Sequence, residues 1–387
     1  MEIKYYNGDK KKGRIYDWDF IRKEYRKLGC PKGVYNPLKI PIESAKWNVL
    51  LSERSTGKTT NLLLFGMVWA WHYNGIMGYI RKNDSMITKK GLESLFSTIL
   101  DWGYVPKITG GRWNSIFYYA AKFYYCNVDE DGNITEKANT PFMRCFALNM
   151  RDSYKSSGGF ENVDYVIFDE FISDRYVLNE FVHLCDLLKT LYRDRYSPIT
   201  FMLANTIDLH SEYFNEMEIY EDIQLIEVGT SQTITTKKGT NIYVELIKDA
   251  KEVSEKKKFN SLFFGFKNPR ISSITGDGWA FSEYPHIEAG FRSIQHGIYI
   301  DYHGRYLELE IVEYAEKGVF IIVHRANKPY DDSVIYSNSE LKDRRYRFHL
   351  GDGSPLDKFI AYCIVNHRIL FHDNSCGTIF FNHVNSK

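Results

Sequence analysis

The stretch Ser52-Glu-Arg-Ser-Thr-Gly-Lys-Thr59 lies between a short apolar run, residues 48–51, and a strongly apolar segment, residues 62–71. A phosphate-binding loop needs backbone N–H groups curled around phosphates where a helix begins, a lysine for the β- and γ-phosphates, and a hydroxyl for magnesium. The Gly-Lys-Thr that ends this stretch supplies these groups in the required order, although a serine stands where the usual pattern has its first glycine. The stretch therefore predicts a strand, a phosphate-binding loop and a buried helix.

A pair of adjacent carboxylates further along the chain supports this interpretation. Asp169 and Glu170 directly follow the continuous apolar run over residues 163–168, which is typical of a buried parallel strand. We expect Asp169 to hold magnesium through water, and Glu170 to polarise the attacking water as a general base. Two exposed acids at a strand end are common by themselves, but their combination with the lysine loop favours a nucleotide site.

Three further polar residues flank the next apolar run, residues 199–204. Asn205 ends this run, where its amide can sense a γ-phosphate or the attacking water; an amide satisfied by backbone groups is the alternative. Arg193 and Arg195 precede the run, and a guanidinium that reaches a neighbouring subunit's γ-phosphate greatly accelerates phosphoryl transfer. Solvated surface arginines are the alternative for both.

The order of the predicted elements indicates an α/β fold in the first half of the chain, because strands alternate with helices. Residues 115–127 and 140–148 are aromatic-rich strand candidates, separated by the turn sequence Asp129–Asn133, and residues 177–192 have helical spacing. The chain has 387 residues, more than twice the roughly 150 of an average domain. We expect a nucleotide-binding domain over residues 1–247, a charged helical linker or lid over 248–275, and a smaller domain over 276–387.

The composition excludes several classes of protein. Hydrophobic residues make up 44% of the chain and the net charge is +1, which excludes a disordered or a polybasic protein. The apolar segment over residues 62–71 is about half the length of a bilayer-spanning helix, so we interpret it as a buried helix of a protein without membrane contact. The six cysteines form no CxxC pair and are expected to be reduced thiols.

Taken in series, the motifs resemble those of viral terminase-type DNA-packaging motors, and in particular the phi-29-like packaging ATPases of small tailed bacteriophages. The resemblance covers residues 45–207. It is carried by the loop over residues 52–59, by Tyr79-Ile-Arg-Lys, by Lys155-Ser-Ser-Gly-Gly, by Ile167-Phe-Asp-Glu-Phe-Ile172, and by the Ala-Asn-Thr that contains Asn205. It implies a P-loop NTPase of the additional-strand, catalytic-glutamate class with a mostly parallel sheet, followed by a smaller α+β ribonuclease-H-like domain.

The resemblance also implies an activity, cofactors and partners. The expected activity is ATP hydrolysis, with Mg2+, that drives double-stranded viral DNA into a procapsid. The expected partners are DNA, further copies of the chain in a homo-oligomeric ring (a pentamer), the portal of the procapsid, and a structural packaging RNA. The expected location is the host cytoplasm, transiently at the portal vertex of the procapsid. Lys155 matches the family's trans-acting lysine, and Arg193 or Arg195 lies where its trans-acting arginine is expected.

The predicted site is therefore the following set. The nucleotide-binding residues are Ser52, Glu53, Arg54, Ser55, Thr56, Gly57, Lys58, Thr59 and Thr60. The magnesium ligands are Thr59 and Asp169, and the catalytic residues are Lys58, Lys155, Glu170, Arg193, Arg195 and Asn205.

The C-terminal domain leaves two alternatives open. Large terminases carry an active two-metal nuclease here, which needs several converging carboxylates; Asp301, Glu308 or Glu310, and Asp357 are the candidates. The resemblance to the phi-29-like branch instead implies a vestigial domain that binds DNA or RNA. A third function, a nucleotide-binding capsid component without hydrolysis, is disfavoured by the two adjacent carboxylates.

Two other patterns have ordinary explanations beside the functional ones. Cys363, His367, His372 and Cys376 have ligand types that zinc accepts, but Cys363 also continues an apolar helical face. The basic clusters are possible phosphate contacts, although a charge run is usually a solvated face; they are residues 10–12, 89–90, 256–258 and 344–347.

Overall fold

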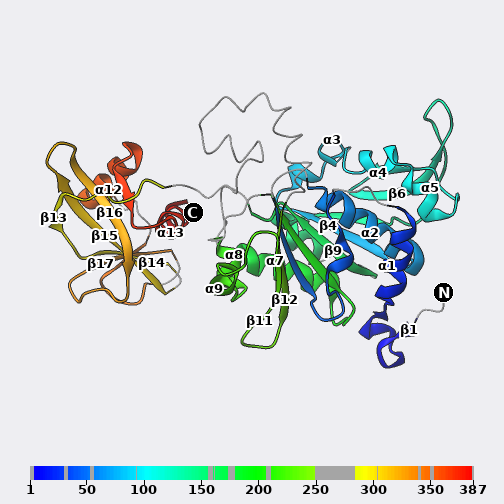
Figure 1. The fold of residues 1–387 in the computed structure, drawn as a ribbon, viewed down its shortest axis with the longest axis horizontal. Coiled ribbons are helices and arrows are strands. Elements are labelled where there is room, and N and C mark those ends of the chain that lie inside the picture. Colours follow the sequence, from blue (N-terminus) through cyan, green and yellow to red (C-terminus); the bar gives the residue numbers. More distant parts are fainter. Residues whose placement is uncertain are drawn as a thin grey trace. The chain divides into compact units, whose positions relative to one another are not determined.

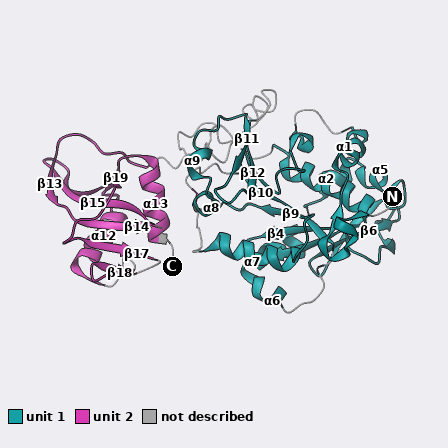
Figure 2. Cartoon of the chain, turned by 90° about the horizontal axis from the view of Figure 1, so that it is seen from below, with its two compact units in different colours: residues 1–173, 179–207, 213–279 teal, residues 174–178, 208–212, 280–387 magenta. Residues whose placement is uncertain are grey.

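The computed structural model describes residues 4–29, 34–52, 56–92, 94–155, 160, 162–172, 179–205, 211–248, 284–302, 304–338, 341–348 and 353–385. Contacts divide the chain into two compact units, the larger built mostly from residues before 280 and the smaller mostly from residues 280–387 (Figure 2). The predicted linker, residues 248–275, lies outside the described residues apart from Lys248.

The larger unit is built around one ten-stranded sheet whose six central strands all run parallel, in the order β12-β3-β10-β9-β4-β8 (Figure 1). These strands are β3 (Trp47–Ser52), β4 (Ile76–Arg81), β8 (Met143–Ala147), β9 (Val163–Asp169), β10 (Ile199–Ala204) and β12 (Asn241–Ile247). Antiparallel strands complete both ends of the sheet: β5 (Ser115–Tyr119), β6 (Lys122–Val128), β7 (Ile134–Lys137) and β11 (Ser231–Thr235). The predicted mostly parallel α/β sheet is confirmed.

Helices cover both faces of this sheet, which explains why its central strands are apolar throughout. All seven residues of β9 are buried. Leu50 of β3 joins the core formed with helix α2 (Lys58–Tyr73), whereas Trp47 points to the opposite face and contacts Phe181 of helix α7 (Glu180–Tyr192). The other helices are α1 (Trp18–Lys27), α3 (Lys89–Leu92), α4 (Ser97–Asp101), α5 (Tyr104–Thr109), α6 (Arg151–Lys155), α8 (Glu212–Glu216) and α9 (Tyr220–Ile223).

Helix α2 confirms the interpretation of the apolar segment as a buried helix. Most of its residues are buried, and it packs so tightly on the sheet that Gly66 is needed. A Cβ on Gly66 would lie 2.7 Å from both Met77 Cε and Tyr165 Cε1. Within the described residues, no helix is both long and apolar enough to cross a membrane.

The smaller unit is a seven-stranded mixed sheet in the order β18-β17-β14-β15-β16-β19, with β13 paired to β15. Strands β14, β15 and β16 are antiparallel neighbours, and β17 and β18 run parallel to β14. The elements are β13 (Phe291–Gln295), β14 (Ile298–Tyr302), β15 (Arg305–Tyr314), β16 (Gly318–Ala326), β17 (Val334–Ser337), β18 (Tyr346–Phe348), β19 (Ile369–Phe371), α12 (Pro355–Val365) and α13 (Asn374–Asn385). This order agrees with the predicted ribonuclease-H-like fold.

The two faces of the smaller sheet differ in character. Both helices pack on the face that carries Ile300, Leu307 and Leu309, and they complete an apolar core there. Because side chains alternate along a strand, Asp301, Tyr306, Glu308 and Glu310 belong to the other face.

Candidate nucleotide site

The candidate site lies at one edge of the larger sheet, because the carboxyl ends of its parallel strands meet there. Lys58, the first residue of α2, follows β3, and Asn205 follows the neighbouring strand β10. The Lys58 ammonium donates to Ser52 Oγ at 2.9 Å and to Asn205 Oδ1, and only 3% of Lys58 is exposed. The side-chain nitrogen of Lys58 is therefore held at the carboxyl end of the sheet by oxygens from two neighbouring strand ends.

The turn before Lys58 has a shape that only glycine adopts easily. Gly57 has φ +77°, and a Cβ there would lie 3.2 Å from Val34 Cβ and 3.3 Å from Asn61 Nδ2. The Asn61 amide donates to the Gly57 carbonyl at 2.9 Å and accepts from the Tyr25 hydroxyl of α1 at 2.8 Å. The Gly57 turn is therefore fixed from two helices, and its close neighbours leave little space for a side chain at this position.

Two oxygen ligands of the kind that Mg2+ prefers lie next to this turn. Thr59 Oγ1 lies 3.3 Å from Asp169 Oδ1, and Asp169 is 7% exposed. The Tyr79 hydroxyl donates to the other carboxylate oxygen at 2.7 Å. Burial, together with the charge of Asp169, raises the pKa of the Tyr79 phenol well above its usual value, so this hydroxyl stays protonated and orients the carboxylate.

Glu170 extends from the same strand end in a different direction. Its backbone has φ +56°, which is uncommon for a glutamate, and its N–H donates to Asp169 Oδ1 at 3.1 Å. Its carboxylate accepts from Arg81 Nη2 at 2.5 Å, and Arg81 Nη1 lies 3.5 Å from Asp169 Oδ2. The guanidinium thus contacts both acids, while nearly half of the Glu170 side chain remains exposed.

Arg81 and Tyr79 are the site residues that the residue-by-residue reasoning missed. Both belong to the end of β4, which the sheet places directly beside β9. The available signal was their place in the Tyr79-Ile-Arg-Lys motif, but the sequence alone does not show which strands are neighbours.

The three candidate trans-acting residues have different environments. The Lys155 ammonium pairs with Asp186 at 2.6 Å and with Asp152 at 2.9 Å, and the hydrogen bonds to these two acids raise the pKa of Lys155. Arg195 donates to the buried Asp164 at 2.6 Å, so its guanidinium is part of the fold. Arg193 is exposed, with no ion pair among the described residues.

The remaining predicted loop residues are partly described. Thr56 is buried and its hydroxyl lies 3.0 Å from Ser52 Oγ, and Thr60 is half-buried in the first turn of α2. Glu53, Arg54 and Ser55 lie outside the described residues.

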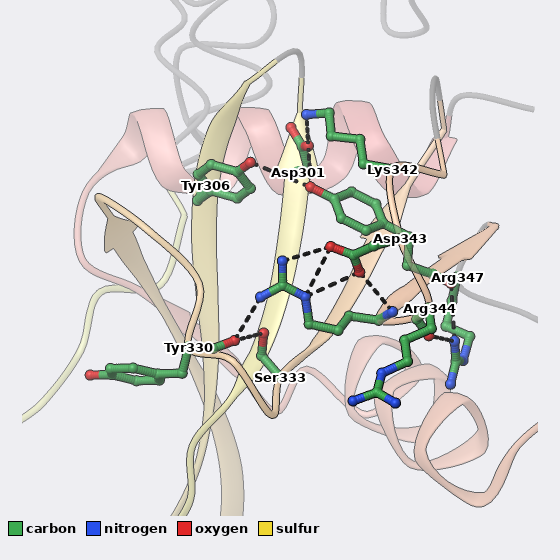
Figure 3. Close-up of polar contacts among 10 residues, drawn as sticks. Asp301, Tyr306, Tyr330, Ser333, Lys342, Asp343, Arg344 and Arg347 are labelled. Carbon is green, nitrogen blue, oxygen red and sulfur yellow. Dashed lines mark hydrogen bonds and ion pairs between the residues drawn. The ribbon is translucent and has the colours of Figure 1, made fainter.

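The acids that the structure describes in the smaller unit are not arranged as a two-metal site. Asp301, which is 3% exposed, accepts from Lys342 Nζ at 2.6 Å, from the Tyr346 hydroxyl at 3.1 Å and from Gly304 N at 2.8 Å. Figure 3 shows the Lys342 ammonium directed at the Asp301 carboxylate. The acid therefore already has a cation and two hydrogen-bond donors.

The other candidate nuclease acids have different partners. Glu308 and Glu310 contact His296, at 3.2 and 3.3 Å. Asp357 is on the helix-covered face, where it accepts from Tyr336 and completes the capping box of α12. The prediction that Asp357 joins Asp301 is wrong, because the sheet separates them. In the part of the chain that the structure describes, no three His, Cys, Asp or Glu residues are arranged to hold a metal ion.

The absence of a metal-binding arrangement among the described residues also includes the candidate zinc ligands Cys363, His367, His372 and Cys376. Cys363 is fully buried in the apolar core against the helices, and burial raises the pKa of its thiol to about 11. A thiol with a raised pKa is a poor source of the thiolate that zinc binds, so the core interpretation of Cys363 holds.

We expect the protein to leave supercoiled plasmid intact in Mg2+ or Mn2+, since within the described residues no further acids are arranged with Asp301 to hold metal ions. Lys342→Ala should also leave the plasmid intact but lower the free energy of unfolding by about 1–2 kcal/mol, because a buried carboxylate loses its half-exposed cation. Gel electrophoresis of the plasmid and urea unfolding measure the two effects. Metal-dependent nicking that disappears in Asp301→Ala would contradict this expectation.

Comparison with known proteins identifies the fold. No protein-family model matches the chain, and no curated protein sequence matches it significantly. The structure of the Phi-28 gp11 DNA packaging motor is similar, with a TM-score of 0.54 and 17% identity over 92% of this chain and 99% of that one. The bacteriophage Phi-29 viral genome packaging motor assembly matches with a TM-score of 0.55 and 17% identity, over 90% and 98% of the two chains.

Both matches extend over nearly the whole of both chains, so they include the smaller unit as well as the larger one. The chain has the fold of these phage DNA-packaging motors. The resemblance that the motifs indicated is thereby confirmed at the level of the fold.

Proposed function

We propose that the protein is an ATP-hydrolysing motor that drives double-stranded viral DNA into a procapsid. The observation that carries this proposal is the convergence of Lys58, Thr59, Asp169, Glu170 and Asn205 at one edge of the parallel sheet. The fold that the chain shares with two phage packaging motors supports DNA packaging as the process that the hydrolysis drives.

The residues at this edge fit Mg-ATP. The left-handed turn at Gly57 and the buried Lys58 ammonium suit the phosphates, and Thr59 with Asp169 offers two oxygen ligands for Mg2+. When bound, the ion neutralises charge on the β- and γ-phosphates. The partly exposed Glu170 carboxylate accepts a proton from the attacking water. Asn205, whose side-chain oxygen accepts a hydrogen bond from Lys58, senses whether the γ-phosphate is present.

A basic residue from a neighbouring copy of the chain completes this site. Arg193 is the better candidate of the two arginines, because the guanidinium of Arg195 is committed to Asp164. Lys155 is the second trans-acting candidate, and its ion pairs with Asp152 and Asp186 must open before it can reach another subunit. This arrangement requires a ring of identical subunits, proposed to be a pentamer.

The further partners follow from the proposed role. They are DNA, the portal and procapsid, and a structural packaging RNA, encountered in the host cytoplasm at the portal vertex. The similar structures are a packaging motor and a packaging motor assembly by their own descriptions, which supports an assembled ring. An active nuclease is a weaker alternative, given the partners of Asp301. A capsid component without hydrolysis leaves Glu170 without a role.

The test is steady-state ATP hydrolysis against protein concentration, with and without double-stranded DNA, using Glu170→Gln as the blank. Turnover that DNA stimulates and that rises faster than linearly with concentration supports a motor whose sites are completed between subunits. Flat turnover without a DNA effect contradicts the trans-acting residue. Nucleotide binding without turnover, also on procapsids, would favour the capsid component.

The described basic clusters differ in how free they are to bind phosphate. Arg345 pairs with Asp343, which lowers the pKa of that acid to about 2. Arg344 and Arg347 contact no carboxylate within the described residues, and Figure 3 shows Arg344 directed away from the hydrogen-bonded network. The lysines at 256–258 lie outside the described residues.

We therefore expect Arg344→Ala combined with Arg347→Ala to weaken DNA binding about equally for all DNA sequences. The slope of log affinity against log salt should fall by about two, one for each lost phosphate contact. Arg345→Ala is the matched control, because its charge is already neutralised by Asp343. Fluorescence anisotropy with a labelled duplex at several salt concentrations gives the slopes, and equal slopes for all three proteins would refute this surface as a DNA contact.

A further inference from the structure

The loop over residues 193–197, which carries Arg193, lies at the opposite edge of the sheet from the nucleotide site of its own subunit. It precedes β10, whose carboxyl end carries Asn205 and whose six residues span about 20 Å. An arginine side chain does not cover that distance. Arg193 can therefore serve only the site of another copy, and how this loop is held decides where its guanidinium is presented.

The N-terminal segment, residues 4–16, packs directly against this loop. The N–H of Tyr196 donates to the carbonyl of Lys12 at 2.9 Å, and the rings of Tyr6 and Tyr196 meet edge to face with centroids 5.7 Å apart. Gly13 has φ +94°, and a Cβ there would overlap Ser197 Oγ and lie 3.1 Å from Arg195 Cβ. The contact between segment and loop is thus too close for any other residue at this position.

A buried carboxylate joins the same two parts of the chain to the sheet. Asp164, in β9, is 1% exposed and accepts from Tyr16 at 2.7 Å, from Ser197 at 2.8 Å and from Arg195 Nε at 2.6 Å. A fully satisfied buried charge of this kind fixes the positions of all its donors, because losing any of them leaves the charge less compensated.

The segment is in turn anchored to the helix that begins at Lys58. Arg14 donates to the carbonyl of Tyr73, the last residue of α2, at 2.5 Å. The Tyr73 hydroxyl accepts from the N–H of Asp17 at 2.7 Å. One end of α2 therefore holds the subunit's own phosphate-binding lysine, and the other end holds the segment that packs on the loop of Arg193.

From these contacts we infer that residues 4–16 are a positioning element for Arg193: they hold its loop in the geometry that the neighbouring copy's γ-phosphate requires. This inference rests on the proposed trans-acting role of Arg193. Its physical basis is that a pre-ordered guanidinium loses less freedom when it binds, and that a misplacement of about 1 Å can cost about 100-fold in rate. The exposed Lys10 and Lys11 add positive charge to the same surface.

The test separates the copy that donates the arginine from the copy that receives it. The donor is full-length Glu170→Gln, which keeps Arg193 but does not hydrolyse ATP. The recipient is Arg193→Ala, which keeps its own hydrolytic residues. Each protein alone is expected to be nearly inactive, and a mixture should recover turnover wherever a donor arginine meets a recipient site.

Gly13→Ala is then placed in either partner, with Gly8→Ala as the matched control. Both glycines have positive φ, but a Cβ at Gly8 meets nothing within 4 Å. We expect Gly13→Ala in the donor to lower the recovered kcat at least tenfold with the KM for ATP unchanged. The same change in the recipient, whose Arg193 is already absent, and Gly8→Ala in the donor should leave turnover as it was.

Each outcome decides the question. A normal rate with Gly13→Ala in the donor, or an equal loss in donor and recipient, overturns the positioning role while the trans-acting arginine stands. No recovery in the unmodified mixture overturns the trans-acting arginine itself, and the inference with it. Full activity with Gly13→Ala in the recipient also shows that this variant folds and binds nucleotide.

Discussion

Glu170→Gln is expected to reduce steady-state ATP hydrolysis by roughly 10²- to 10⁴-fold while the affinity for Mg-ATP stays within about twofold. The amide cannot accept the proton of the attacking water, but it keeps the size of the side chain and its oxygen for Arg81. This loss corresponds to about 3 to 5 kcal/mol of transition-state stabilisation. A steady-state hydrolysis assay and a fluorescent ATP analogue for binding measure the two quantities separately.

Asp169→Asn is the informative comparison for Glu170→Gln. Asp169 is buried against Thr59 and Tyr79, where it suits a metal ion, so its change should weaken binding of Mg-ATP as well as turnover. If Glu170→Gln instead keeps normal turnover, the base is another group. If both variants lose binding equally, the two acids act together as metal ligands.

The second large effect is expected for Arg193→Ala, which should lower kcat by roughly 10³- to 10⁵-fold, the contribution of a trans-acting arginine in related chemistry. Arg193 is exposed, so the free energy of unfolding should change by no more than about 0.5 kcal/mol. Turnover is measured at concentrations where the wild-type protein assembles, and unfolding is followed in urea.

Arg195→Ala is expected to behave in the opposite way. Removing its guanidinium leaves Asp164 buried with only hydroxyl donors, which should cost about 3 kcal/mol of stability. The remaining folded protein should lose far less turnover per folded site than Arg193→Ala does, because it keeps the trans-acting guanidinium, although the loop of Arg193 has lost one of its anchors. A stable Arg195→Ala protein without activity, beside an active Arg193→Ala protein, would reverse the assignment of the two arginines.

Much of the larger domain could be predicted from the sequence because its signals are local. The run over residues 163–168 and the run over 199–204 are apolar throughout, as strands covered on both faces must be, and both are strands. The smaller unit has a local signal of the same kind at the start of α12, where Ser354 caps the helix and Pro355 suits its first turn.

The local sequence did not predict one tight turn, because the turn is formed by residues that are uncommon in turns. Residues 115–127 read as one aromatic strand, but they form β5 and β6, joined by a tight turn at Ala120 and Ala121. Both alanines have positive φ, a conformation for which alanine gives no sequence signal. The pairing of the two strands, which stacks Phe117 on Tyr124, stabilises a turn that its own residues disfavour.

By itself, the sequence determined the order of the elements and the chemistry of the phosphate-binding lysine, the adjacent acids and the amide, because these depend on residues within a few positions of one another. Only the tertiary structure decided which strands are neighbours. That order brings the Arg81 guanidinium into contact with the Glu170 carboxylate. It also pairs Arg195 with the buried Asp164, while Arg193 stays exposed. In the smaller unit, the sheet separates Asp357 from Asp301. The physical reason is that ion pairs and burial depend on distances of a few ångströms in space. The residues involved are far apart along the chain, so the sequence does not show that they are in contact.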